Sequence, residues 1–283
     1  MGNSKSIKYK CFCVADSNYV DQALLSIKSY FEHNTFPVTL YKFGDFDTSK
    51  FTEFKNLTIE QVGDLDIPYY DNYSSYKDTV NLISAKIKIF DDLIGQYDYA
   101  VCFDVDSIFT GNVDELFREY ENDLMGVPEP WAKEDVHRDS KYLNAGFLIY
   151  KLGNPLLSEY KNFLKENWWV LFPEQDFLSY YVKKREVIPL KYNYMPNGYA
   201  TTEDTRFIHF ASPLKPFGFK DFNRFFVRKS KEFAETFSMY FDYVSRNKDI
   251  LSDKFYEKCL ETSKRLSILK AINDRRAYES LNI

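Results

Sequence analysis

Apolar residues in the first half of the chain follow two alternating spacings. Short runs rich in β-branched and aromatic residues predict strands, and they cover residues 8–15, 37–43, 57–62 and 99–103. Between them, apolar residues recur three and four positions apart, which predicts helices around 23–31 and over 80–94. Strands that alternate with helices predict an α/β fold, with a mostly parallel sheet and helices on both faces.

The second half of the chain is less regular. Its pattern predicts strands over 143–152 and 207–210 and helices over 156–164 and 174–181. From residue 220 onward the chain is charged and helical, with no glycine or proline after Gly218. We therefore expect a principal domain over residues 1–219 and a helical C-terminal extension over 220–283 that packs on it.

Charge and composition exclude some classes of protein. The net charge of −5 and the pI near 5.4 argue against nucleic acid as a partner, because a phosphate polymer favours a basic face. The N-terminal residues are polar, and no stretch approaches the roughly 20 apolar residues that span a bilayer. We expect a cytoplasmic protein.

The four cysteines are Cys11, Cys13, Cys102 and Cys259. They form no Cys-x-x-Cys pair and no zinc-type group with histidine. We expect buried free thiols, as in a reducing compartment.

Two aspartates follow the predicted strand over 99–103. Asp104 and Asp106 are separated by one residue, so in extended chain their carboxylates lie on one side while Val105 faces the core. Neighbouring carboxylates repel each other unless a cation or protons intervene, and oxygen ligands suit Mn²⁺ or Mg²⁺. A polar turn after a strand explains the same residues, and spacing alone does not decide between the two.

Further motifs follow in a fixed order: ADSNY at 15–19, SAKI at 84–87, YLNAG at 142–146, EQD at 174–176 and IHFASPLKPF at 208–217. With the Asp-x-Asp pair they resemble the retaining glycosyltransferases of family 8, which include glycogenin and bacterial lipopolysaccharide galactosyl- and glucosyltransferases. The resemblance runs from about residue 13 to 217. It implies a GT-A (Rossmann-like) fold with a mixed, mostly parallel sheet, and transfer of a hexose from a UDP-sugar.

For the metal and the diphosphate, the resemblance implies a specific set of residues. Asp104, Asp106 and His209 would ligate Mn²⁺ (or Mg²⁺), and the backbone at Val105 would lie against the nucleoside. Lys215 would bind the diphosphate.

For the nucleoside, the resemblance implies contacts from Ala15, Asp16 and Tyr19 to uracil or ribose. A simple N-cap of the following helix is the competing interpretation of Asp16, and both can hold.

For the donor sugar, the resemblance implies that Asn144 reaches the hydroxyls while Ala145 and Gly146 allow a close approach. At Gly146 a packing requirement within a strand is equally plausible.

Three residues at the start of the predicted helix over 174–181 complete the implied sugar site. Glu174 and Asp176 would hold the sugar, and Gln175 would lie beside the anomeric carbon. Acidic residues are also favoured at a helix N-terminus after a proline, which is the alternative interpretation of the two acids.

Four positions depart from the family pattern. Lys86 stands where an arginine usually reaches the donor, and Glu174 stands for an aspartate. Ser212 replaces a glycine and Phe217 a tryptophan. A solvated helix lysine is the alternative interpretation of Lys86.

The mechanism that these parts imply is a same-face transfer through a short-lived oxocarbenium-like ion pair. A double displacement needs a carboxylate nucleophile beneath the sugar ring, and Gln175 is a poor one. Retention of configuration is implied by the resemblance.

The C-terminal stretch carries five basic residues among apolar ones: Lys264, Arg265, Lys270, Arg275 and Arg276. Such a helix suits peripheral contact with an anionic membrane, or an ordinary surface helix whose apolar stripe faces the core.

Two functions compete with a hexosyltransferase. One is a scaffold that binds nucleotide-sugars without catalysis, and the other is a nucleotidyltransferase, which would require a glycine-rich basic loop near the N-terminus. The acceptor is open: a glycan, a lipid-linked molecule or a protein.

Overall fold

The computed structural model describes residues 6–63, 65, 67, 77–130, 142–167, 172–196, 204–211 and 230–281. Within α2, α6 and α7, the side chains of 77–81, 230–234, 269–270 and 272–281 are not described.

Seven strands form the main sheet, in the order β3-β2-β1-β4-β7-β6-β8. Strands β3, β2, β1 and β4 run parallel, β7 is antiparallel to β4 and β6, and β8 is parallel to β6. The predicted mixed, mostly parallel sheet is thus confirmed. The strands are β1 (Tyr9–Ala15), β2 (Val38–Lys42), β3 (Leu57–Gln61), β4 (Tyr99–Phe103), β6 (Leu124–Pro128), β7 (Leu143–Lys151) and β8 (Arg185–Val187).

A second, two-stranded sheet positions the candidate site. It joins β5 (Ser107–Phe109) to β9 (Phe207–His209) in antiparallel register, with Ser107 opposite His209. This pairing places the segment that follows Asp106 beside His209, which lies about a hundred residues further along the chain.

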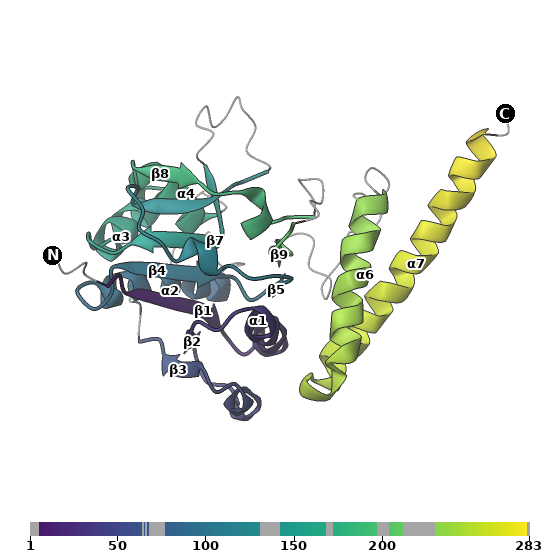
Figure 1. Ribbon diagram of the computed structural model, residues 1–283, viewed down its shortest axis with the longest axis horizontal. Helices are drawn as coiled ribbons and strands as arrows, with labels where there is room; N and C mark the ends of the chain where they lie inside the picture. The colour runs from purple at the N-terminus through teal and green to yellow at the C-terminus, as the bar shows by residue number, and fades with distance from the viewer. Residues whose placement is uncertain are drawn as a thin grey trace.

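Helices cover both faces of the sheet (Figure 1). Alternate residues of β1 enter different core clusters: Cys13 packs with Ile27 of α1, whereas Phe12 packs with Phe90 of α2. This is the period of two expected of a strand buried on both faces. The helices around the sheet are α1 (Val20–His33), α2 (Lys77–Leu93), α3 (Leu157–Glu166) and α4 (Pro173–Tyr181).

The helical extension packs against the principal domain. Helices α6 (Ser230–Arg246) and α7 (Asp253–Leu281) lie side by side next to β5 and β9 (Figure 1). Phe237 of α6 shares a buried cluster with Leu25 of α1, Ile108 of β5 and Ile208 of β9. The boundary at 219/220 lies outside the described residues and stays a prediction.

The described part of α7 turns its apolar stripe inward. Phe255, Cys259 and Leu266 are buried and Lys264 and Arg265 are exposed, although Leu260 and Ile268 are exposed as well. This arrangement supports the surface-helix interpretation for that part. The side chains of Lys270, Arg275 and Arg276 lie outside the described ones, so membrane contact through them stays a prediction.

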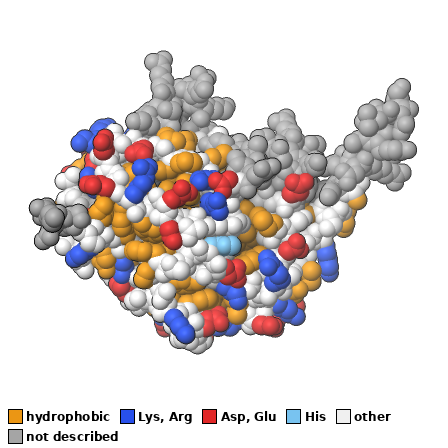
Figure 2. Space-filling view, in the orientation of Figure 1, with side chains coloured by type: hydrophobic (Ala, Val, Ile, Leu, Met, Phe, Trp, Pro, Cys, Tyr) orange, Lys and Arg blue, Asp and Glu red, His pale blue; other side chains and the backbone are white. Residues whose placement is uncertain are grey.

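The distribution of charged side chains and the state of the cysteines agree with what the sequence predicts. Acidic and basic side chains are interspersed over the face that Figure 2 draws. All four cysteines are buried and free, as expected. Within the described residues, no helix is long and apolar enough to cross a membrane.

Candidate donor and metal site

Asp104 and Asp106 lie in a turn that two neighbouring strands fix. The Asp104 N–H donates to the Gly146 carbonyl at the start of β7 (2.8 Å). The Asp106 carbonyl accepts from Phe210 N–H just after β9 (2.9 Å). Val105 is buried in the core, as the spacing predicts.

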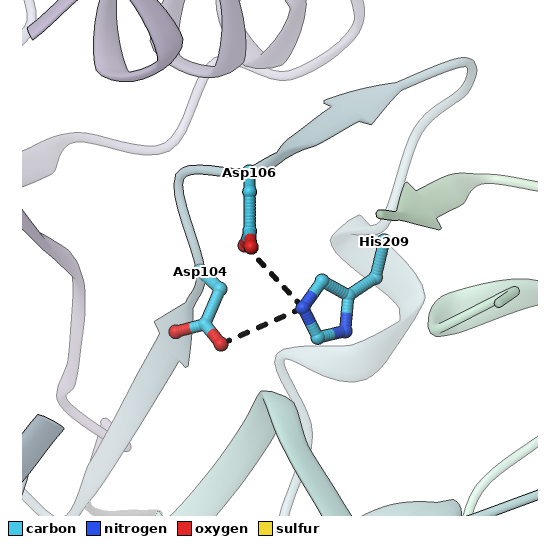
Figure 3. A group of neighbouring side chains, drawn as sticks. All are labelled: Asp104, Asp106 and His209. Carbon is cyan, nitrogen blue, oxygen red and sulfur yellow. Dashed lines mark ion pairs between the residues drawn. The ribbon is translucent and has the colours of Figure 1, made fainter. Parts of the chain in front are cut away.

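His209 completes a group of three potential metal ligands (Figure 3). Its Nε2 lies 3.3 Å from Asp106 Oδ1 and 3.6 Å from Asp104 Oδ2. One ligand atom from each residue lies within 4.8 Å of the others, which fits a single ion. In the part of the chain that the structure describes, no other group of three His, Cys, Asp or Glu side chains could hold one.

A contact on the far side of the ring favours one tautomer of His209. Asn144 Oδ1 accepts from the Gly146 backbone N–H (2.8 Å), so this atom must be the amide oxygen. The same oxygen lies 3.2 Å from His209 Nδ1, and because an amide oxygen only accepts, this contact is a hydrogen bond in the tautomer with the proton on Nδ1. The lone pair then resides on Nε2, which faces Asp104 and Asp106, as a metal ligand requires.

The charge balance of the three residues calls for a cation. Burial opposes a charge on His209, but the Asp106 and Asp104 carboxylates outweigh it and raise the pKa of the imidazole. Oxygen and imidazole ligands fit a divalent transition metal such as Mn²⁺.

Gly146 leaves room for the imidazole of His209. A Cβ at this position would lie 2.0 Å from His209 Nδ1 and 2.1 Å from Cε1, far inside contact distance. The packing interpretation of this glycine is therefore supported, and the close neighbour is the histidine ring.

Lys86 is buried, so its interpretation as a solvated helix lysine is wrong. Its Nζ lies 2.6 Å from Asp104 Oδ1 and 3.6 Å from Glu174 Oε1, and it donates to the Ala145 carbonyl (3.1 Å). Burial lowers the pKa of this ammonium, but the two carboxylates outweigh burial and raise it overall. Contact between Lys86 and a donor stays a prediction.

Helix α4 begins at Pro173 and carries Glu174 and Gln175 into the interior. Burial raises the pKa of Glu174, although the Lys86 ammonium acts in the opposite direction. Gln175 Oε1 accepts from Ala145 N–H (2.9 Å) and from Asn144 Nδ2 (3.3 Å). The backbone donor identifies this atom as the amide oxygen, and its two lone pairs both have donors.

Two residues that the sequence analysis missed complete this network. Glu129 Oε2 accepts from Asn144 Nδ2 (2.7 Å) and from Gln175 Nε2 (3.1 Å). Asn193, fully buried, donates to Asn144 Oδ1 (2.8 Å). Neither lies in a motif, and only three-dimensional proximity identifies them.

Asp176 is half-buried at the first turn of α4. Its two carboxylate oxygens accept from Tyr142 OH (2.7 Å) and from the Phe172 backbone N–H (3.3 Å). The second contact lies at the helix N-terminus and supports the local interpretation of this acid, while sugar binding by Asp176, Glu174 and Asn144 stays a prediction.

Ala15, Asp16 and Tyr19 lie at the carboxyl end of β1, next to the end of β4. Asp16 accepts from Asn18 N–H (2.8 Å) in a local turn, and the N-cap of α1 is Tyr19. The N-cap interpretation of Asp16 is therefore wrong. Nucleoside contacts by these residues stay predictions.

The remaining implied residues, Lys215, Ser212 and Phe217, lie outside the described residues. The predicted diphosphate contact of Lys215 is therefore untested.

Several solved structures with a similar fold are glycosyltransferases. The chain is similar to the galactosyltransferase LgtC in complex with donor and acceptor sugar analogues, with TM-score 0.60 and 13% identity, over 80% of this chain and 94% of that one. It is similar to the glycosyltransferase GlyE of Streptococcus pneumoniae TIGR4, with TM-score 0.61 and 16% identity, over 93% of this chain and 64% of that one. At these identities the likeness shows the fold.

Sequence comparison identifies the family. No curated protein matches the chain significantly. Residues 10–220, most of the chain, match the sequence profile of Glycosyl transferase family 8. The chain belongs to glycosyltransferase family 8.

Proposed function

We propose that the chain is a retaining hexosyltransferase that moves glucose or galactose from a UDP-sugar to a glycan, lipid-linked or protein acceptor. Mn²⁺, or Mg²⁺, serves as the cofactor, and the protein acts in the cytoplasm. The observation that carries the proposal is the group of Asp104, Asp106 and His209, whose ligand atoms lie within 4.8 Å of one another.

A bound divalent ion supplies Lewis-acid stabilisation of the charge on the departing diphosphate. Asp104, Asp106 and His209 would hold it, and Asn144 would keep the imidazole in the tautomer that ligation needs. Lys215 adds a second positive charge for the diphosphate.

The sugar transfer itself needs no protein nucleophile. Both lone pairs of Gln175 Oε1 have N–H donors, which favours an ion-pair route over a covalent intermediate. The bond from the anomeric carbon to the phosphate oxygen breaks, and its electron pair leaves with the diphosphate. The acceptor oxygen then bonds to the anomeric carbon on the same face, and its proton passes to the departing diphosphate.

UDP release from UDP-glucose and UDP-galactose, with and without Mn²⁺, tests the proposal. We expect release that requires the metal and that vanishes in Asp106→Ala, because this change removes a ligand. Asp45→Ala, the same change at a fully exposed loop carboxylate, serves as the matched control. If no UDP-sugar is turned over, yet UDP binds with Mn²⁺, the chain is a nucleotide-sugar-binding scaffold instead.

A further inference from the structure

The ammonium of Lys86 is held from three directions. It contacts Asp104 after β4, the Ala145 carbonyl of β7, and Glu174 of α4. Asp104 Oδ1 (2.6 Å) and the Ala145 carbonyl (3.1 Å) lie within hydrogen-bond distance of its Nζ, and Glu174 Oε1 at 3.6 Å is an ion-pair partner. Lys86 is therefore part of the protein framework beside the metal ligands.

The two carboxylate oxygens of Asp104 have different neighbours. Oδ1 lies 2.6 Å from the Lys86 ammonium, whereas Oδ2 faces His209 Nε2 at 3.6 Å. Figure 3 shows one oxygen directed to the imidazole and the other turned away from it. An ion held by Asp106 and His209 therefore meets Asp104 through Oδ2.

Ligation by both oxygens of Asp104 would be unfavourable. It would bring a doubly charged ion close to a buried ammonium, and repulsion grows as the separation falls. It would also take Oδ1 from Lys86, and a buried charge without its partner is costly. Lys86 thus leaves Asp104 one oxygen for the metal.

We propose that Lys86 sets the ion selectivity of this site, by restricting Asp104 to ligation through one oxygen. Mg²⁺ requires short bonds in octahedral geometry, and Mn²⁺ accepts the same arrangement, whereas Ca²⁺ takes more oxygens and uses carboxylates with both. The site therefore favours Mn²⁺ and Mg²⁺ over Ca²⁺. This inference rests on the metal site of the proposed function.

Metal binding to the full chain, without substrate, provides the test. The electron paramagnetic resonance signal of free Mn²⁺ gives its affinity, and displacement by Ca²⁺ gives the affinity of the competitor. In Lys86→Met the loss of a positive charge strengthens binding of both ions. We expect the preference for Mn²⁺ over Ca²⁺ to fall by about tenfold as well, because both Asp104 oxygens become available.

Two further variants separate this role from a general effect on the helix. Lys86→Arg keeps a cation beside Oδ1 and should retain the wild-type preference. Lys88→Met removes a lysine of the same helix that pairs with Asp92, and it should change neither affinity.

An unchanged preference in Lys86→Met overturns the inference. If that variant does not fold, a crystal structure of the wild-type chain with Mn²⁺ decides: Asp104 bound through Oδ2 alone supports it, and binding through both oxygens overturns it. Absence of Mn²⁺ binding by the wild type overturns the metal site and the proposed function together. Mn²⁺ binding with an unchanged preference overturns only the role of Lys86.

Discussion

At the scale of single residues, the backbone of Gly146 packs directly against the imidazole ring of His209. We predict that Gly146→Ala weakens Mn²⁺ binding at least tenfold, because the added methyl would lie 2.0 Å from Nδ1 and displace the ring. Titration followed by electron paramagnetic resonance measures the change. Gly153→Ala is the matched control, because a Cβ there meets no atom within 4 Å. Equal affinity in the two variants would contradict the prediction.

Glu129 provides an acceptor for the amides of Asn144 and Gln175, which are both buried. We predict that Glu129→Ala lowers the free energy of unfolding by about 1–3 kcal/mol, because buried N–H groups lose their acceptor. Glu129→Gln keeps a carbonyl oxygen in reach and should cost less than about 1 kcal/mol. Urea unfolding measures both changes.

The control for Glu129 is Glu186, which accepts from Asn122 Nδ2 at 3.0 Å but is 32% exposed. Water can replace the lost bond there, so Glu186→Ala should cost less than Glu129→Ala. If Glu129→Ala and Glu186→Ala lower the free energy of unfolding equally, the buried amides at Glu129 contribute no more stability than an exposed hydrogen bond.

Sequence motifs identified several residues of the candidate site, but they did not predict the hydrogen bonds among them. The Asp-x-Asp pair and His209 lie in motifs, and the structure brings them together. Glu129 and Asn193 lie in no recognisable pattern, since their roles depend on the approach of β6, β7 and α4 in space. The resemblance placed Asn144 at the sugar, whereas its oxygen also orients the histidine, and only geometry reveals that.

At the scale of elements, periodicity predicted the central strands and most helices, while β5, β6 and β8 were missed. Strand β6 has the sequence Leu-Met-Gly-Val-Pro, and glycine and proline are disfavoured in strands. Strands β5 and β8 are only three residues long, too short for alternation to show, whereas the equally short β9 lies in the apolar-rich run 207–210. Pairing with neighbours, which a local pattern does not contain, stabilises all three.

One carboxylate connects helix α1 to the start of α7. Asp21 accepts from Ser252 N–H (2.7 Å) and Ser252 Oγ (2.6 Å), and the Phe255 N–H donates to Ser252 Oγ (3.2 Å) as in a helix N-cap. We predict that Asp21→Ala costs about 1 kcal/mol of stability. It should also increase hydrogen exchange in the first turns of α7. Asp249→Ala, at an exposed position nearby, should change neither measurement.

At the scale of the whole molecule, the helical extension covers residues that adjoin the site. Phe210, the residue after His209, packs against two rings of α6. The ring centroids lie 4.7 Å apart for Tyr240 and 5.6 Å apart for Phe237. Its backbone N–H also donates to the Asp106 carbonyl. The extension therefore supports the paired strands β5 and β9, which adjoin Asp106 and carry His209, two of the three candidate metal ligands.

This connection predicts different results for two truncations. A chain that ends at residue 268 keeps the buried residues of α7 up to Leu266, so it should fold and bind Mn²⁺ like the full chain. A chain without residues 230–283 exposes Ile108, Ile208 and Phe210, and it should aggregate or lose Mn²⁺ binding.

Phe237→Ala is the milder test, because a cavity in this cluster should lower the free energy of unfolding by about 3–5 kcal/mol. Solubility, urea unfolding and Mn²⁺ titration measure these outcomes. Full Mn²⁺ affinity and wild-type stability without α6 and α7 would show that the principal domain supports the metal site unaided.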